Sequence, residues 1–166
     1  YLDYPRPIML SSGRIAVEKN LEAFLKLPLP GTKVLIGDGP QRTELVARYP
    51  EAFFLGYRYD GDYARCLAAA DVFVFPSRTD TFGLVLLEAL ASGLPVAAFP
   101  AVAPRDVIKG APVGCLDEDL RRACLEALEL KRDDCRDFAL GLTWAASARI
   151  FLEHVDAVRA GKRRAA

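Results

Sequence analysis

Short apolar runs alternate along this chain with longer amphipathic stretches, at a spacing of roughly 20 residues. Within each run the apolar residues are consecutive rather than alternating, which is typical of strands in a parallel sheet whose two faces are both covered. The runs lie at residues 8–10, 34–36, 53–55, 72–75, 96–99 and 114–116. The pattern predicts an α/β fold, with a Rossmann-like, doubly wound parallel sheet of about six strands flanked by helices.

The stretches between these runs carry helical patterns that end at proline or glycine. They predict helices at residues 18–26, 41–48, 60–70, 83–92 and 119–128. Residues 142–159 predict one long amphipathic helix at the C-terminal end. We therefore expect residues 1–166 to form a single domain. Its abrupt start, close to the first strand, favours a domain cut from a longer protein.

Charge and cysteine content exclude several classes of function. The 22 Lys and Arg balance the 22 Asp and Glu, so a nucleic-acid binder that works by bulk electrostatics is excluded. We interpret the basic residues at 159 and 162–164 as a solvated tail. The four cysteines (66, 115, 124 and 135) and the single histidine, His154, lack the paired spacing of a zinc site. The scattered cysteines indicate reduced thiols and a cytoplasmic chain, and the absence of a long apolar run predicts a soluble one. We expect neither a metal nor a cofactor.

In an open α/β sheet, ligands bind outside the carboxyl ends of the strands. The loop after the first strand contains Gly13 and Arg14, with Lys19 five residues beyond. Glycine allows close approach of the backbone, and two cations beside a helix N-terminus would suit a pyrophosphate. An ordinary turn with two surface cations is the alternative.

The loop after the second strand, residues 37–40 (Gly-Asp-Gly-Pro), resembles a dinucleotide fingerprint only in part. Arg42 stands where the third glycine would fall, and no acidic residue follows at the ribose position. We interpret these glycines as structural. The same absence argues against a nicotinamide-dependent oxidoreductase. The loop after the third strand, with Tyr57 and Arg58, could line a base pocket or form a surface cluster.

The loop after the fourth strand leads into an apolar helix. One carboxylate lies in this loop and a second lies within the helix. Asp80 precedes the predicted helix and Glu88 lies about two turns into it, so their Cα atoms should be roughly 10–12 Å apart. The amides of residues 82–85 should point out of the helix N-terminus, toward a pyrophosphate. Alternatively, Asp80 caps the helix and Glu88 is a solvated acid. Glu88 lies among apolar residues, which favours a ligand hydroxyl as its partner.

Taken together, these motifs resemble the C-terminal domain of the family 4 (group 1) retaining glycosyltransferases, which have the GT-B fold of two Rossmann-like domains. The matching segments are Gly13-Arg14-x4-Lys19, residues 37–40, Phe54-Leu55-Gly56, residues 70–77, and Thr81-Phe82-Gly83-x4-Glu88-Ala89-x3-Gly93-x-Pro95-Val96. They occur in the family's order and cover about residues 8–155.

The resemblance implies a binding site for a nucleoside diphosphate sugar. Arg14, Lys19 and Asp80 would be catalytic: the two cations neutralise the diphosphate leaving group without a metal, and Asp80 contacts the transferred sugar where the family usually has Glu. Glu88 would hold the ribose hydroxyls. The remaining donor-binding positions are Gly13, Gly56, Tyr57, Thr81, Phe82, Gly83, Leu84 and Val85.

The resemblance also implies partners. The donor would be GDP-mannose or a UDP-hexose, because the chain looks similar to bacterial GDP-mannose-dependent α-mannosyltransferases. An N-terminal acceptor-binding domain would be missing from this chain, so we expect the chain by itself to be inactive in sugar transfer. The acceptor of the full-length enzyme would be a lipid or a glycan. The enzyme would lie in the cytoplasm, at the periphery of the membrane. A non-catalytic sugar-nucleotide-binding module and a nucleotide-sugar epimerase or hydrolase remain alternatives.

Overall fold

A computed structural model describes residues 3–159 and 161 of the chain. Its strands form one six-stranded parallel sheet in the order β3-β2-β1-β4-β5-β6. The bounds are β1 Ile8–Ser12, β2 Thr32–Ile36, β3 Phe53–Phe54, β4 Val72–Phe75, β5 Val96–Ala98 and β6 Gly114–Leu116. Every predicted run is a strand, and the doubly wound α/β prediction is confirmed.

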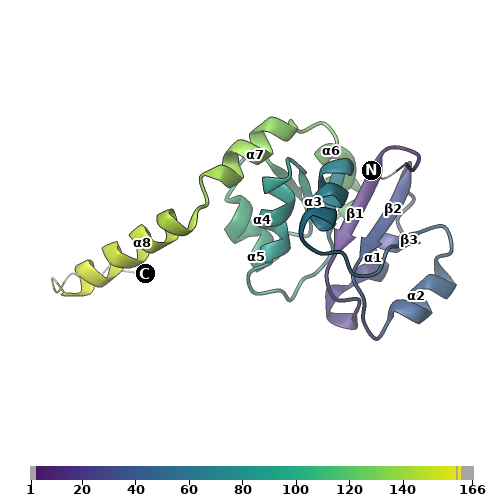
Figure 1. Cartoon of the computed structure of the whole chain (residues 1–166), viewed down its shortest axis with the longest axis horizontal. Coiled ribbons are helices and arrows are strands. Elements are labelled where there is room, and N and C mark those ends of the chain that lie inside the picture. Colours follow the sequence, from purple (N-terminus) through teal and green to yellow (C-terminus); the bar gives the residue numbers. More distant parts are fainter. Residues whose placement is uncertain (1–2, 160, 162–166) are drawn as a thin grey trace.

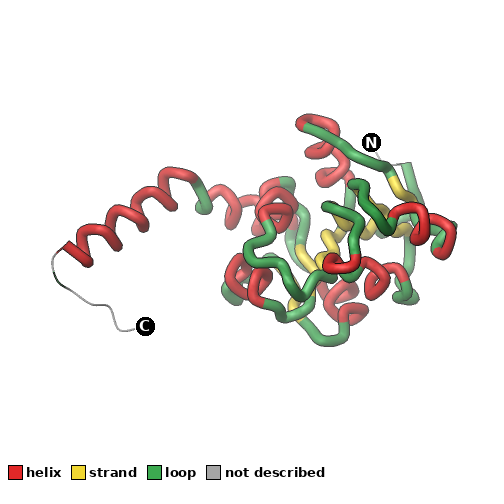
Figure 2. The backbone as a smooth tube through the Cα atoms, turned by 90° about the horizontal axis from the view of Figure 1, so that it is seen from below, coloured by secondary structure: helices red, strands yellow, loops and turns green. Residues whose placement is uncertain are grey.

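Consecutive residues of the central strands enter opposite faces of the sheet, which explains their uniformly apolar sequences. In β4, Val72 and Val74 pack into one core cluster while Phe73 and Phe75 pack into the other. Helices cover both faces (Figures 1 and 2). One face carries α1 Leu21–Leu25, α2 Arg42–Arg48 and α6 Leu120–Ala127; the other carries α3 Asp60–Ala69, α4 Leu84–Ala91, α5 Val102–Ile108 and α7 Arg132–Leu140.

Two helices were not predicted from the sequence. In α5, Pro104 suggests a break, yet it falls in the first turn, where no intrahelical N–H bond is lost. In α7, Cys135 is buried and Phe138 and Ala139 pack against the same core cluster, so a short apolar face lies within a largely charged segment. Hydrogen bonds from Arg132 to the carbonyls of Ala68 (2.8 Å) and Ala70 (2.5 Å) also hold α7 in place.

The last helix, α8 Trp144–Arg159, projects from the domain body in both views (Figures 1 and 2). It confirms the predicted C-terminal helix, and none of its described side chains is buried. Trp144 is 91% exposed. The predicted solvated tail at 162–164 lies outside the described residues. Across residues 3–159, no helix is long and apolar enough to cross a membrane.

Candidate functional site

The carboxyl ends of β1 and β4 lie side by side, and their two loops are joined directly. Asn20 Nδ2 donates to the Pro76 carbonyl (3.1 Å), and the carbonyl of Glu18 accepts from Ser77 Oγ (3.3 Å) and Thr79 Oγ1 (3.2 Å). In the observed strand order this is the topological switch point, where the chain turns to opposite sides of the sheet. Ligand binding was predicted at the strand ends, and the structure shows that the loops after β1 and β4 are hydrogen-bonded to each other there.

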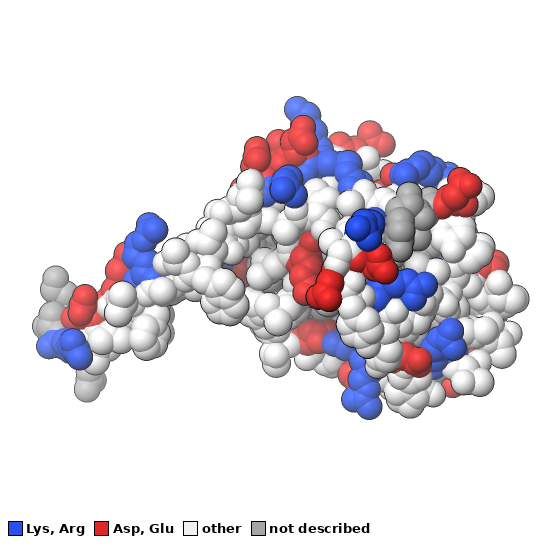
Figure 3. Space-filling view, in the orientation of Figure 1, with Lys and Arg blue, Asp and Glu red and all other residues white. Residues whose placement is uncertain are grey.

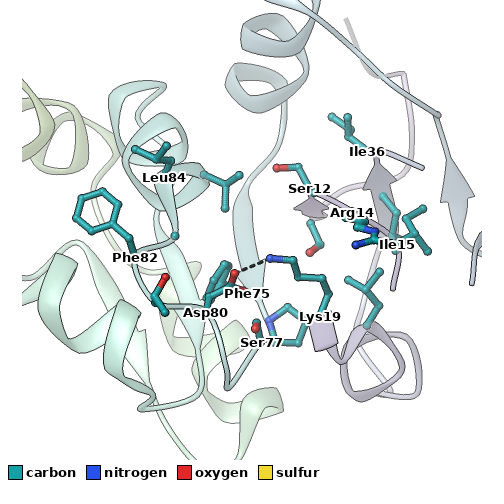
Figure 4. A pocket seen from close by; sticks show the side chains of 18 residues that line it. Ser12, Arg14, Ile15, Lys19, Ile36, Phe75, Ser77, Asp80, Phe82 and Leu84 are labelled. Atoms are coloured by element: carbon teal, nitrogen blue, oxygen red, sulfur yellow. Dashed lines mark hydrogen bonds and ion pairs between the residues drawn. The ribbon is translucent and has the colours of Figure 1, made fainter. Parts of the chain in front are cut away.

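A cavity of about 260 Å³ opens between these two loops. Figure 4 shows Lys19 reaching across it from the β1 side to Asp80 on the β4–α4 loop. The distance from Lys19 Nζ to Asp80 Oδ1 is 2.5 Å, and the two side chains are only 28% and 20% exposed. The other Asp80 oxygen, Oδ2, is buried and has no hydrogen-bond partner among the described residues. Asp80 is thus paired through Oδ1, whereas its buried Oδ2 lacks a partner among the described residues.

Helix α4 begins later than the sequence suggested. Gly83 is its N-cap residue with a φ of 73°, a backbone conformation that glycine adopts readily, and no side chain caps the helix. The alternative interpretation of Asp80 as a cap is therefore wrong. Glu88 lies little more than one turn into the helix rather than about two, because the helical residues start at Leu84.

The first amides of α4 face the same cavity. Helix geometry leaves the N–H groups of Leu84 and Val85 without an acceptor one turn back, and both residues line the cavity with Thr81, Phe82 and Gly83. Phe82 precedes the helix, so its amide is not part of the helical N-terminus. Its ring is 55% exposed and points away from Lys19 (Figure 4).

A second cavity, of about 490 Å³, adjoins the first and shares Ser12, Gly13, Arg14, Ile36 and Val85 with it. Its further lining comes from Tyr57, Arg58, Tyr63, Glu88 and residues 37–40. The two cavities therefore lie side by side along the edge formed by the carboxyl ends of the strands. Asp80 borders the first cavity and Glu88 borders the second.

Glu88 has a partner that the sequence did not reveal. Tyr63 on α3 donates its hydroxyl to Glu88 Oε2 at 3.1 Å, and the same hydroxyl lies 2.7 Å from Ser12 Oγ. The expectation that Glu88 needs a partner is met within the protein, although its side chain remains exposed. The only signal in the sequence was the position of Tyr63 one turn before the buried Cys66 on α3.

Arg14 and the β3–α3 loop lie at the rim of the cavities. Arg14 lines both cavities, is 67% exposed and is 3.9 Å from Glu18 Oε1, so its guanidinium is loosely held. Tyr57 is also exposed and stacks on Tyr59, with ring centroids 5.9 Å apart. Gly56 is not among the lining residues; its carbonyl accepts from the Gly37 amide (2.9 Å) and fixes the loop.

The glycines of residues 37–40 allow two loops to pack closely. A Cβ on Gly37 would lie 1.9 Å from the Gly13 carbonyl oxygen, and one on Gly39 would lie 2.4 Å from that of Ile15. The geometry agrees with the structural interpretation of these glycines. The loop also lines the second cavity, which the sequence analysis did not anticipate.

Charge and thiols elsewhere add no competing site. On the face shown in Figure 3, basic and acidic side chains are interspersed over the domain. Within residues 3–159, no group of three or more His, Cys, Asp or Glu side chains is placed to hold a metal ion. Burial raises the pKa of Cys124 to about 12 and that of Cys135 to about 11, so neither thiol is activated. That the reaction needs no metal stays a prediction.

Comparison with known proteins assigns the chain to a family. The model of the group 1 glycosyl transferases matches residues 6–130. The chain belongs to the group 1 glycosyltransferases. A GDP-mannose-dependent alpha-mannosyltransferase of Mycobacterium tuberculosis is 36% identical over 165 residues, which cover 93% of this chain and 44% of that protein. The sulfoquinovosyl transferase SQD2 of Arabidopsis thaliana is 40% identical over 108 residues, 62% of this chain and 21% of that protein.

Solved structures agree on the fold of this glycosyltransferase domain. The lipopolysaccharide outer core galactosyltransferase WaaB superposes with a TM-score of 0.77 at 18% identity, over 93% of this chain and 50% of that one. AviGT4, from avilamycin A biosynthesis, gives 0.75 at 21% identity, over 95% and 52%. These neighbours are GT-B glycosyltransferases, which confirms the predicted architecture. The chain spans less than half the length of the mannosyltransferase that it matches.

Proposed function

We propose that this chain is the donor-binding domain of a retaining glycosyltransferase and binds a nucleoside diphosphate sugar across the two adjoining cavities. The observation that carries the proposal is the junction at the β1/β4 switch point. There, Lys19, Asp80 and the first amides of α4 border one cavity, and Glu88 borders the next. A cation, a helix N-terminus and two separated carboxylates are the groups that a diphosphate between two sugars requires.

The diphosphate would occupy the junction itself. Leu84 and Val85 offer amides at the positive end of the α4 dipole, and Lys19 is already fixed beside them. Arg14 lies where both cavities meet, so it can close over the diphosphate once a ligand is present. Arginine and lysine next to a helix N-terminus suit an anion of this kind.

The nucleoside would lie in the second cavity. Glu88 would accept hydrogen bonds from the ribose hydroxyls, since an ionised carboxylate can accept from two vicinal donors. Tyr57 and Arg58 line the same cavity and would contact the base. Gly56 would contribute by setting the path of that loop rather than by direct contact.

The transferred sugar would lie in the first cavity beside Asp80. Its buried Oδ2 has no partner among the described residues, and it would accept from a sugar hydroxyl once donor binding uncovers it. Mannose carried by GDP is the donor that the sequence relatives favour, because three of them are named GDP-mannose-dependent alpha-mannosyltransferases. A UDP-hexose is the second candidate, supported by the fold neighbour HepE of Anabaena, which was solved with UDP.

Catalysis would consist mainly of stabilising the leaving group. As the bond from the anomeric carbon to phosphate breaks, negative charge grows on the diphosphate, so Lys19, Arg14 and the α4 amides act more strongly in the transition state. These groups would stabilise the charge on the diphosphate in place of a metal ion. The hydroxyl acceptor, a lipid or a glycan, would be bound by a further domain. The 166-residue chain by itself should bind the donor without transferring its sugar, in a cytoplasmic enzyme that works at the membrane surface.

Calorimetric titration of the chain with GDP, UDP and ADP tests this proposal. One nucleotide should bind, and Lys19→Ala should weaken it about 10- to 100-fold, the range for a hydrogen bond to a charged group. Lys26→Ala is the matched control, because Lys26 also pairs with a carboxylate, at 3.4 Å, but lies outside both cavities.

Three outcomes would contradict the proposal. The absence of binding by all three nucleotides would contradict donor binding, and equal losses in the two lysine variants would contradict the diphosphate position. Turnover of GDP-mannose without an acceptor would favour an epimerase or hydrolase instead.

A further inference from the structure

Tyr63 links three elements at the second cavity. It lies on α3, its ring packs against the core, and its hydroxyl reaches Glu88 on α4 and Ser12 at the end of β1. It is also one of the residues that line the cavity. A tyrosine in this position does more than fill space, because its polar end is directed at a carboxylate that borders the proposed nucleoside site.

The direction of each hydrogen bond follows from the chemistry of the groups. An ionised carboxylate only accepts, so the single hydroxyl proton of Tyr63 goes to Glu88 Oε2. The Ser12 hydroxyl must then donate to the Tyr63 oxygen across their 2.7 Å contact. Burial raises the pKa of Tyr63, so this proton stays in place at any physiological pH.

We infer that Tyr63 is a positioning residue that holds Glu88 ready for the ribose of the donor. The inference rests on the proposed function, in which Glu88 accepts from the ribose hydroxyls. The Tyr63 hydroxyl occupies Oε2 and leaves Oε1 to accept from the ligand. Ser12 in turn fixes the orientation of the Tyr63 hydroxyl, so the hydrogen-bonded series Ser12–Tyr63–Glu88 connects the carboxyl end of β1 to the proposed ribose carboxylate.

The hydrogen bond from Tyr63 reduces the conformational entropy that the Glu88 side chain loses when the ligand binds. Glu88 is exposed on a helix, where a free glutamate samples many rotamers, and ordering it on binding would weaken the contact. A hydrogen bond already made in the unliganded protein removes part of that penalty. Loss of the Tyr63 hydroxyl should therefore affect only ligands that have ribose hydroxyls.

Paired titrations with GDP and UDP, each against its 2′,3′-dideoxy analogue, separate positioning from structural support. Tyr63→Phe should weaken binding of the ribonucleotide about tenfold, which corresponds to about 1.4 kcal/mol, and leave the dideoxy analogue unchanged. Glu88→Ala should weaken the ribonucleotide at least as much. Tyr49→Phe is the matched control, because Tyr49 also donates to a glutamate, Glu22 at 3.3 Å, away from both cavities.

The outcomes distinguish this inference from the function on which it rests. Equal losses for the two analogues in Tyr63→Phe, or no loss at all, would overturn the positioning role even if Glu88→Ala behaves as expected. If Glu88→Ala does not reduce the preference for the ribonucleotide, the ribose assignment itself is wrong. If neither GDP nor UDP binds the unaltered chain, the proposed function and the inference both fail.

Discussion

Asp80 and Lys19 form an ion pair where the diphosphate should bind, so the unliganded site partly neutralises its own cation. Replacing Asp80 with Asn keeps the shape of the side chain and removes its negative charge. The ammonium of Lys19 then becomes fully available to an incoming phosphate, and the repulsion between carboxylate and diphosphate disappears. We therefore expect Asp80→Asn to bind the nucleoside diphosphate more tightly than the unaltered chain.

The size of the effect follows from the geometry. Lys19 Nζ lies 2.5 Å from Asp80 Oδ1, so a phosphate oxygen hydrogen-bonded on the far side of Nζ would be about 5 Å from the carboxylate. Two unit charges at that distance repel by about 1–3 kcal/mol for effective dielectric constants between about 80 and 20. The affinity for GDP or UDP should rise by about fivefold or more at low salt, and the gain should shrink at high salt.

The same variant should lose affinity for the sugar. Asn offers a weaker acceptor than the buried, unpartnered Oδ2 of Asp80, so the additional affinity that a nucleotide sugar has over the free nucleotide should fall. Calorimetry with the nucleotide and the nucleotide sugar, at two salt concentrations, measures both effects. Unchanged or weaker binding of the free nucleotide by Asp80→Asn would refute the reasoning.

Three further predictions concern the domain around the site. Gly37→Ala should lower the free energy of unfolding by at least about 2 kcal/mol in urea titrations, because its Cβ would lie 1.9 Å from a backbone oxygen. Gly61→Ala should cost nothing, because its Cβ would make only ordinary contacts, at 3.8 Å or more, with the Arg65 side chain; equal effects of the two substitutions would contradict this. Burial raises the pKa of Cys124 to about 12, so iodoacetamide at pH 8 should label it only after unfolding, and mass spectrometry showing rapid native labelling would contradict the buried position. Removal of residues 142–166 should leave nucleotide affinity unchanged, and the free energy of unfolding should stay within about 0.5 kcal/mol of that of the unaltered chain, because no described side chain of α8 is buried. A larger loss in either the nucleotide or the urea titration would show that α8 supports the domain.

The strands were predictable because their physical requirement is simple. A parallel strand covered on both faces must be apolar at every position, and β4 satisfies this without exception. The doubly wound pattern also predicted that ligands bind at the carboxyl ends of the strands, but the strand order, which places the switch point between β1 and β4, came from the structure. Helix α5 was missed because Pro104 suggested a break, and α7 was missed because its many charged residues hide a short apolar face.

The site was predictable where short-range spacing carries the information. Lys19 was expected at the diphosphate and Asp80 at the transferred sugar, and the structure places the two in one ion pair. Their contact with each other, and that of Tyr63 with Glu88, depend on how separate loops and helices approach in space. No spacing in the sequence encodes such a contact. The start of α4 was misjudged for a related reason: the φ of 73° at Gly83 makes it the N-cap, whereas the apolar pattern suggested a helical residue.

Residue-by-residue mapping of nucleotide binding by NMR tests the central claim most directly. In a titration of the isotopically labelled chain with GDP or UDP, the largest amide shifts should occur at Gly13, Leu84 and Val85, which surround the junction of the two cavities. The amides of α8 should not move. Saturable shifts centred elsewhere, with these three amides unchanged, would contradict a diphosphate site at the β1/β4 switch point.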